Sequence, residues 1–195
     1  LIIFTLGGLF NSLAGIVAST TSSDVLGAVL LGLLLLIVEQ VISIPISIYS
    51  TFVIEEKHGF NKTTTKTFVT DMFKSLLISA TISSIIYATV IYIVVNLGDN
   101  WWIYAFGAVF ILQAIIFFLY PVLIMPLFNK FEPLDNEEFK KPIENLLKKV
   151  DFKSKGLFVM NASLRSTHGN AFFTGFGKNK RIVFFDTLLK TITPD

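Results

Sequence analysis

Two long stretches of the sequence, residues 1–54 and 75–129, contain no lysine or arginine. All 16 basic residues lie outside them, four in the window 57–74 and twelve in the window 130–190. Both stretches are largely apolar, and only 15% of the chain is charged, against about 25% in soluble domains. Apolar spans joined by loops of alternating charge are typical of proteins that cross a membrane several times. The sequence therefore predicts a mainly α, multi-span transmembrane protein.

The apolar stretches divide at polar residues into four expected spans. The second run would be about 45 Å long as a helix, longer than the roughly 30 Å of bilayer hydrocarbon, so we expect Pro45 to kink it. A threonine-rich tract at 62–70 is expected to be a polar loop, and Pro126 to end the last span. The expected spans are about 1–18, 25–54, 74–97 and 101–125.

The distribution of charge predicts the orientation of these spans. Basic loops follow the second and fourth spans, whereas the connectors at 19–24 and 96–100 contain no base. The positive-inside rule then places residues 55–73 and 127–195 in the cytosol. We expect a transmembrane region at 1–126 and the start of a cytosolic domain at 127–195. The formal charge of +2 gives no indication of nucleic-acid binding.

The cytosolic segment is predicted to be a small α+β structure. Either Asp135 with Glu138 forms a capping box for an amphipathic helix, or that helix begins at Pro142. A strand is expected at 156–160. The apolar residues that recur at helical spacing are Phe139, Ile143, Leu146, Leu147 and Val150.

The stretch 165–189 is polar at first and strand-like afterwards. Two runs rich in β-branched and aromatic residues, 171–176 and 181–186, are separated by turn-forming residues at 177–180. This pattern is typical of a β-hairpin. The hairpin provides an edge strand, whose unpaired backbone groups must be covered or can accept an extended peptide as an added strand.

Candidate catalytic groups are sparse. The only two histidines, His58 and His168, lie in separate segments and do not form the i, i+4 pair of a helical zinc site. Ser163 and Ser166 lack the nucleophile elbow of a serine hydrolase. The sequence contains no cysteine, which excludes disulfides and thiolate ligands within it. We therefore predict no catalytic residue and no metal ligand among these 195 residues.

Several acidic residues permit more than one interpretation. Glu39 and Gln40 lie in the middle of the second span, where a carboxylate is costly unless it faces a partner or a water-filled cavity. They either line a cavity, as in a transporter, or form a structural, paired group. The adjacent Glu55 and Glu56 would diverge on a helix, which favours salt bridging with Lys57 over a carboxylate dyad.

Three segments together resemble the type I CAAX prenyl proteases, membrane zinc endopeptidases that cut prenylated C-terminal tails. The most specific is Phe-Val-Ile-Glu-Glu-Lys-His-Gly-Phe-Asn at 52–61, followed by Pro-Leu-Phe-Asn-Lys-Phe-Glu-Pro-Leu at 126–134 and by the stretch 165–189. They occur in the order of the family and extend over nearly the whole chain. The loop motif of this resemblance consists of Glu55, Glu56, Lys57, His58, Gly59, Phe60 and Asn61.

The resemblance implies a substrate-binding role for the third segment. In the family this segment lies along the active-site groove, where its asparagine contacts the substrate backbone. By the match Asn170 takes this role, with Ala171 and Phe172 on the strand that pairs with the peptide and His168 just before them. Gly169 stands where the family usually has serine, which loosens the backbone there.

The resemblance also implies zinc as cofactor, a prenylated CAAX-type protein as substrate and the endoplasmic reticulum membrane as location. The His-Glu-x-x-His helix and the third ligand of the family, a glutamate, would follow Asp195. The sequence has no initiator Met, begins inside an apolar run and stops just after a helix is expected to begin, so we expect a fragment cut at both ends. Because it lacks the metal motif of the family, we expect it to be inactive alone. The alternatives are a non-catalytic scaffold, a transporter that uses Glu39 and Gln40, or a related protease for non-prenylated substrates.

Overall fold

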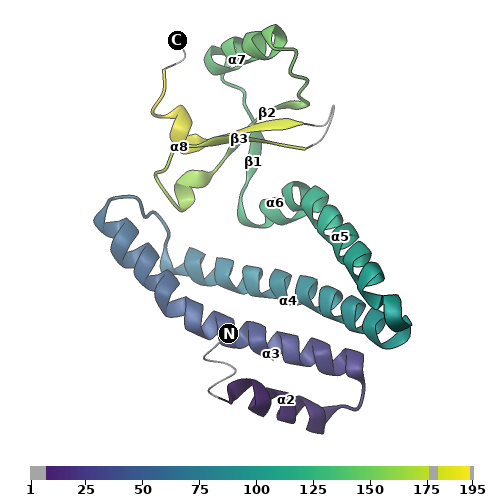
Figure 1. Cartoon of the computed structure of the whole chain (residues 1–195). Coiled ribbons are helices and arrows are strands. Elements are labelled where there is room, and N and C mark those ends of the chain that lie inside the picture. Colours follow the sequence, from purple (N-terminus) through teal and green to yellow (C-terminus); the bar gives the residue numbers. More distant parts are fainter. Residues whose placement is uncertain (1–7, 176–179, 194–195) are drawn as a thin grey trace. The chain divides into compact units, whose positions relative to one another are not determined.

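The computed structural model describes residues 8–175 and 180–193 and is mainly helical (Figure 1). The mainly α class predicted from the sequence is thus confirmed. The chain forms two compact units. The first, called here the helical unit, comprises Leu1–Ser47 and Met72–Ile116. The second, called the sheet unit, comprises Ile48–Asp71 and Phe117–Asp195.

Three helical segments of the described chain are long and apolar enough to cross a membrane: Asp24–Glu55, Thr65–Asn96 and Gly98–Phe128. They correspond to the second, third and fourth expected spans. The first expected span appears as a shorter helix of 12 residues, and residues 1–7 lie outside the described chain. The helices are α2 (Leu9–Thr20), α3 (Asp24–Tyr49), α4 (Thr65–Asn96) and α5 (Trp101–Leu119), with a short 3₁₀ turn, η2 (Gly98–Asn100), before α5.

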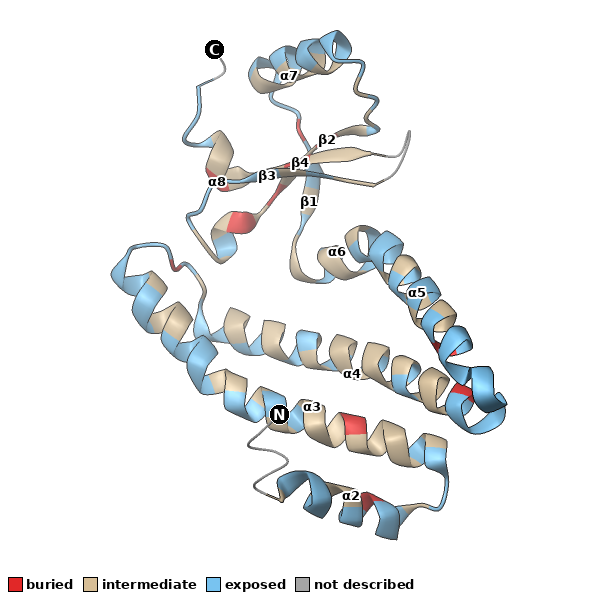
Figure 2. Ribbon diagram, in the orientation of Figure 1, coloured by how far each residue is buried: buried red, intermediate tan, exposed pale blue. Residues whose placement is uncertain are grey.

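Close packing inside the helical unit depends on a small residue. Gly32 of α3 is buried, and a Cβ atom added there would lie 2.2 Å from the ring of Tyr87 on α4. Small residues of this kind let membrane helices approach each other. Large apolar side chains remain exposed on the same helices, with Leu77 68% and Phe106 73% exposed, so most of their surface is coloured as exposed or intermediate (Figure 2). Such surfaces are stable in lipid rather than in water.

Two long helices end in wide π-helical turns that the sequence did not reveal. The segment η1 (Ser50–Glu55) continues α3, and η3 (Tyr120–Ile124), which contains Pro121, continues α5. Pro45 lies inside α3. The helical segment does not end at Pro126, because α6 (Met125–Phe128) contains this proline and extends the segment to Phe128.

The threonine-rich tract was predicted to be a loop, and this prediction is wrong for its second half. Helix α4 begins at Thr65 rather than near residue 74. The hydroxyl of Thr64 accepts a hydrogen bond from the backbone N–H of Thr67 at 3.1 Å, which caps the helix. Thr64 therefore acts as a helix start signal within the tract. The division at residue 126 refers to the bilayer and stays a prediction.

The sheet unit contains a four-stranded sheet in the order β1-β2-β4-β3. Strand β4 pairs in parallel with β2 and antiparallel with β3, so the predicted hairpin and its edge strand are confirmed. Residues 176–179, which include most of the turn expected at 177–180 and the last residue of the expected first strand, lie outside the described chain. The predicted second strand is one residue too long, because Asp186 begins a helix. The elements are β1 (Phe131–Pro133), β2 (Gly156–Met160), β3 (Ala171–Thr174), β4 (Arg181–Phe185), η4 (Ala162–Leu164) and α8 (Asp186–Leu189).

The core of the sheet unit forms around the central strand β4. Val183 is only 2% exposed and clusters with Met160 and Ala162. Phe172 and Phe185 pack against this cluster, with ring centroids 6.2 Å apart in an edge-to-face arrangement. The core around Val183 of β4 therefore packs against one face of the edge strand β3, through Phe172.

The predicted amphipathic helix is α7 (Glu137–Lys149). The expected capping box of Asp135 and Glu138 is wrong, because Asn136 is the N-cap and its side chain accepts from the backbone N–H of Glu138 at 2.9 Å. The alternative start at Pro142 is also wrong, since that proline lies inside the helix.

Candidate functional site

The loop motif 55–61 is a tight turn that closes on its own first residue. The backbone carbonyl of Glu55 accepts from Phe60 N at 2.9 Å and from Asn61 N at 3.3 Å, and Gly59 supplies the positive φ of +74° that the turn needs. Asn61 is 9% exposed, and its amide donates to Glu56 Oε2 at 2.8 Å. The salt bridge with Lys57 that the sequence favoured for Glu56 is therefore not observed in the described chain, because Glu56 bonds to Asn61.

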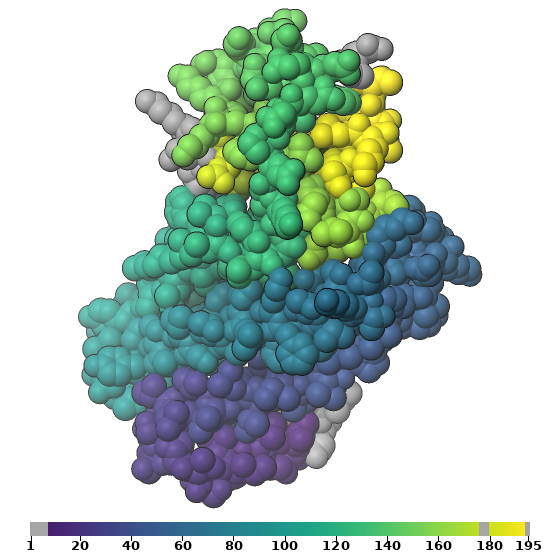
Figure 3. Space-filling view, turned by 180° about the vertical axis from the view of Figure 1, so that it is seen from behind, coloured from purple at the N-terminus to yellow at the C-terminus, as the bar shows by residue number. Residues whose placement is uncertain are grey.

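The loop motif binds the segment that leads into the edge strand. Asn61 forms an isolated antiparallel bridge with Ser166. The carbonyl of Phe60 accepts from Thr167 N at 3.0 Å, and the Phe60 ring lies 4.2 Å from the ring of His168, centroid to centroid. The dark blue surface of the loop and the yellow-green surface of residues near 165 adjoin in Figure 3. Two segments that the sequence singled out separately therefore form one structure.

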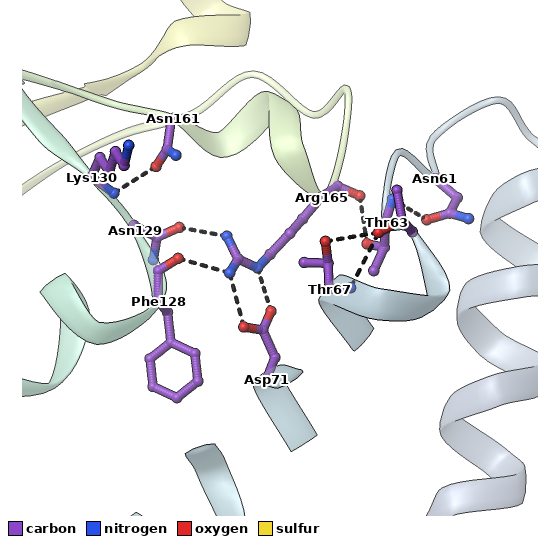
Figure 4. Close-up of polar contacts among 10 residues, drawn as sticks. Asn61, Thr63, Thr67, Asp71, Phe128, Asn129, Lys130, Asn161 and Arg165 are labelled. Carbon is purple, nitrogen blue, oxygen red and sulfur yellow. Dashed lines mark hydrogen bonds and ion pairs between the residues drawn. The ribbon is translucent and has the colours of Figure 1, made fainter. Parts of the chain in front are cut away.

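Arg165 joins these segments to the helix ends. Its Nε donates to Asp71 Oδ2 at 2.7 Å and its Nη2 donates to Asp71 Oδ1 at 3.0 Å, which makes a bidentate ion pair. Nη1 donates to Asn129 Oδ1 at 3.1 Å, and Nη2 donates to the carbonyl of Phe128 at 2.7 Å (Figure 4). The Arg165 and Asp71 side chains are 27% and 22% exposed. Because both are largely shielded from water, this pair is stronger than an ordinary surface pair.

The second family-like segment, 126–134, makes a further connection. The backbone N–H of Lys130 donates to Asn161 Oδ1 at 2.7 Å, and Asn161 N donates to the carbonyl of Lys130 at 3.3 Å. Asn161 follows β2, and Asn129 of the same segment bonds Arg165. All three segments of the resemblance thus meet around Arg165.

On the edge strand β3, the backbone N–H and C=O groups of every second residue point away from β4. Phe185 N donates to the carbonyl of Asn170 at 2.9 Å, so Asn170 pairs inward with β4. With the observed register, Phe172 also pairs inward, and the backbone groups of Ala171 and Phe173 point away from β4. The side-chain oxygen of Asn170 accepts from Ala171 N at 2.8 Å and so covers the first of these outward groups.

The predicted substrate-binding residues take different positions around this edge. His168, Asn170 and Ala171 are exposed, whereas the Phe172 side chain packs against the core cluster. Phe173, which the sequence did not single out, is 66% exposed. Strand alternation could have identified it, because Phe172 and Phe173 must point to opposite faces. The substrate-binding role of these residues stays a prediction.

Gly169 has a packing role that the sequence did not indicate. A Cβ atom added there would lie 3.3 Å from both Cα and Cδ1 of Leu188 in α8. The carbonyl of His168 accepts from the Thr187 hydroxyl at 2.7 Å, and Thr187 is buried. The segment before β3 is therefore fixed to α8 as well as to the loop motif.

The described residues do not assemble a catalytic centre. Ser163 donates through both its backbone N–H and its hydroxyl to the carboxylate of Asp186, and it makes no described bond to a histidine. Residues 8–175 and 180–193 contain no group of three or more His, Cys, Asp or Glu side chains that could hold a metal ion. His58 and His168 both lie near Phe60, at centroid distances of 6.4 and 4.2 Å. The described residues therefore do not fit a zinc site.

The described chain combines three helices that are long and apolar enough to cross a membrane with a four-stranded sheet in which β3 is an edge strand. Residues 1–130 match the family described as CAAX prenyl protease N-terminal, five membrane helices, and residues 133–195 match peptidase family M48. The chain belongs to this family of CAAX prenyl proteases, as the sequence resemblance indicated.

Individual relatives agree with this assignment. The chain is 47% identical to a probable CAAX prenyl protease 1 of Schizosaccharomyces pombe over 154 residues, covering 79% of this chain and 32% of that protein. It is 38% identical to a mouse CAAX prenyl protease 1 homolog over 188 residues, covering 96% and 39%. The crystal structure of S. mikatae Ste24p matches with a TM-score of 0.89 and 37% identity, over 97% of this chain and 45% of that one. The chain spans about a third of the length of the curated relatives it matches.

These matches favour a protease over the scaffold and transporter alternatives. Glu39 is exposed on α3, and Gln40 beside it is half-buried. Neither residue lies in the sheet unit, where the three family-like segments meet.

Proposed function

We propose that this chain forms membrane helices and the substrate-binding edge of a zinc endopeptidase that removes the C-terminal tripeptide of prenylated CAAX proteins. The observation that carries the proposal is the open edge of β3, which is held by the loop motif and by Arg165. Family membership supports a peptidase, and the names of the relatives support a prenylated substrate.

The edge strand would bind substrate by strand addition. The backbone groups of Ala171 and Phe173 face outward, so an extended peptide can pair with them. The amide of Asn170 lies at the start of this edge, where it can donate to a substrate carbonyl. For a peptide to pair with Ala171 N, the Asn170 oxygen must first release it. The exposed Phe173 ring offers an apolar contact to a substrate side chain.

The zinc ligands would be residues other than those described. Its chemistry in such enzymes is polarisation of the scissile carbonyl and activation of water. The contribution of this chain is to bind and orient the peptide. We place residues 55–73 and 127–195 on the cytosolic side because the basic residues lie mainly in these segments. The resemblance to the family supports the endoplasmic reticulum membrane as the location.

The test is cleavage of a farnesylated CAAX peptide by the full-length gene product, together with its zinc content. Activity with about one zinc per chain is expected. Asn170→Ala should lower kcat/KM roughly tenfold, because a desolvated substrate amide would lose its partner. Asn145→Ala, which removes an exposed asparagine from α7, is the matched control and should leave kcat/KM unchanged. Full activity of Asn170→Ala would exclude the role of that side chain.

The outcome for the whole proposal is separate. A full-length product that holds no zinc and cleaves neither prenylated nor unprenylated peptides would indicate a non-catalytic scaffold. Equal cleavage of both peptides would indicate a membrane protease of broader specificity.

A further inference from the structure

The guanidinium group of Arg165 donates more hydrogen bonds than an ordinary surface ion pair needs. Four of its hydrogen bonds reach three different partners: Asp71, Asn129 and the carbonyl of Phe128. A guanidinium group has five N–H donors in a fixed plane, so these bonds also fix the direction of the side chain. A lysine carries its three donors on a single nitrogen, so it could not reproduce the planar pair in which two nitrogens bond one carboxylate.

The contrast with an exposed pair shows what is unusual here. Lys141 and Glu137 of α7 lie 3.7 Å apart with side chains 73% and 59% exposed. Such pairs contribute little to stability. The Arg165–Asp71 pair is shorter and largely shielded, and it connects residues 94 positions apart in the sequence.

Hydrogen bonds fix the backbone at most positions between Arg165 and the edge strand. The Arg165 carbonyl accepts from Lys62 N at 3.0 Å, and Thr167 N donates to the carbonyl of Phe60 at 3.0 Å. The His168 carbonyl accepts from Thr187, and Asn170 pairs with β4. A displacement of Arg165 is therefore transmitted within a few residues to Ala171, the first residue of β3.

We propose that Arg165 is a positioning residue for substrate binding. It holds the segment 165–170 against Asp71 and Asn129, and so fixes the outward-facing backbone groups of β3 in the register that an extended peptide needs. The inference rests on the proposed function, because it assumes that the edge of β3 receives the substrate. It predicts a defect in peptide binding rather than in the turnover of bound peptide.

The experiment measures a coupling between Arg165 and the substrate backbone in the full-length gene product. Arg165→Met, Arg165→Lys and Asp71→Asn are assayed with a farnesylated peptide and with the same peptide N-methylated at a backbone amide before the cleaved bond. Lys141→Met is the matched control. Arg165→Met should raise KM about tenfold and change kcat by less than about twofold.

The N-methyl peptide separates positioning from a general structural defect. Methylation should lower kcat/KM about tenfold for the wild type and for Lys141→Met, but only about twofold for Arg165→Met, because the hydrogen bond it removes is already weakened. Arg165→Lys and Asp71→Asn should fall between. An equal loss on methylation in wild type and Arg165→Met would overturn the inference. If Arg165→Met does not accumulate in membranes, Arg165→Lys and Asp71→Asn complete the same cycle.

Hydrogen exchange makes the test independent of activity. The amides of Phe172 and Thr174, which pair with β4, should exchange faster in Arg165→Met than in wild type, while those of α7 stay unchanged. Unchanged exchange at these two amides would overturn the positioning role even if the full-length product cleaved no peptide. A wild type that cleaves nothing, with exchange raised as expected in the variant, would count against the proposed function alone.

Discussion

Serine and threonine side chains of the helical unit bond to nearby residues, whereas the sheet unit also has side-chain bonds between residues far apart in the sequence. Thr81, Ser84 and Thr89 of α4 each donate to a carbonyl one turn earlier in the same helix, at 2.7–2.8 Å. In the sheet unit, by contrast, Asn161 accepts from a residue 31 positions away and Arg165 donates to one 94 positions away. Specific polar pairs over long sequence distances thus add to the apolar core of the sheet unit, whereas the helical unit packs mainly through shape and apolar surfaces.

This difference explains where sequence motifs concentrate. All three family-like segments, 52–61, 126–134 and 165–189, lie in the sheet unit. A lipid-facing position accepts many apolar residues of suitable size, whereas a position such as Asn61 needs one donor and one acceptor in a fixed arrangement. Specific residues are therefore informative in one unit, and hydropathy is informative in the other.

The largest expected effect comes from placing an aspartate at an exposed apolar position in each unit, which tests whether that position faces lipid or water. Ile111 of α5 and Leu146 of α7 are isomeric side chains, and each is 59% exposed. Ile111→Asp should destabilise insertion by about 3 kcal/mol, because a carboxylate would enter lipid. Leu146→Asp should change stability by less than about 0.5 kcal/mol, because its site faces water.

The measurement is the fraction of full-length protein integrated in membranes, together with its melting temperature in detergent. Equal losses for the two variants would show that Leu146 is covered in the intact protein or that α5 does not face lipid. Either result would remove the contrast between the two exposed surfaces.

The second prediction concerns the polar pairs of the sheet unit. Asn61→Ala should cost about 1–3 kcal/mol, since Thr63 N loses the acceptor that now lies at 2.7 Å and Glu56 loses its donor. Asn61→Asp keeps an acceptor for Thr63 but places two carboxylates together, so it should also destabilise the protein. Thermal unfolding of the detergent-solubilised, full-length protein measures both changes.

A compensating substitution sharpens this prediction. Glu56→Gln supplies an amide donor, so the double variant Glu56→Gln with Asn61→Asp should recover part of the stability that Asn61→Asp loses. Strictly additive losses would mean that the Glu56–Asn61 bond contributes nothing.

The same contrast decides what the sequence could predict. Charge windows and hydropathy located three long helices, and runs of β-branched and aromatic residues separated by turn formers located the hairpin of β3 and β4, because these signals are local. The bond between Arg165 and Asp71 has no local signal, since the two residues are 94 positions apart and neither belongs to a periodic pattern. The parallel pairing of β2 with β4 is likewise a property of the tertiary structure.

Errors at element ends have a local physical cause. Thr64 and Asn136 act as caps through side chains that accept N–H groups of the first helical turn. A run of threonines has several candidate caps, and the adjacent pair Asp135 and Asn136 offers two, so the sequence alone does not decide between them. The substrate-binding set shows a similar limit, because Phe172 and Phe173 are alike in sequence but differ in burial.

The smallest expected effect tests shape in the helical unit. Gly32→Ala places a methyl group 2.2 Å from the present position of the Tyr87 ring. The ring is the end of a flexible side chain and can rotate away, so the loss should be only about 1 kcal/mol, at the low end for overpacking.

The matched control is Gly107→Ala on α5, where an added Cβ atom meets nothing within 4 Å. This variant should keep or slightly raise the melting temperature, because alanine favours a helix. Gly32→Ala combined with Tyr87→Ala should melt no lower than Tyr87→Ala alone, because the methyl group then has space. A Gly32→Ala variant as stable as Gly107→Ala would mean that α3 and α4 do not depend on this close approach, and that apolar surroundings alone hold the helices together.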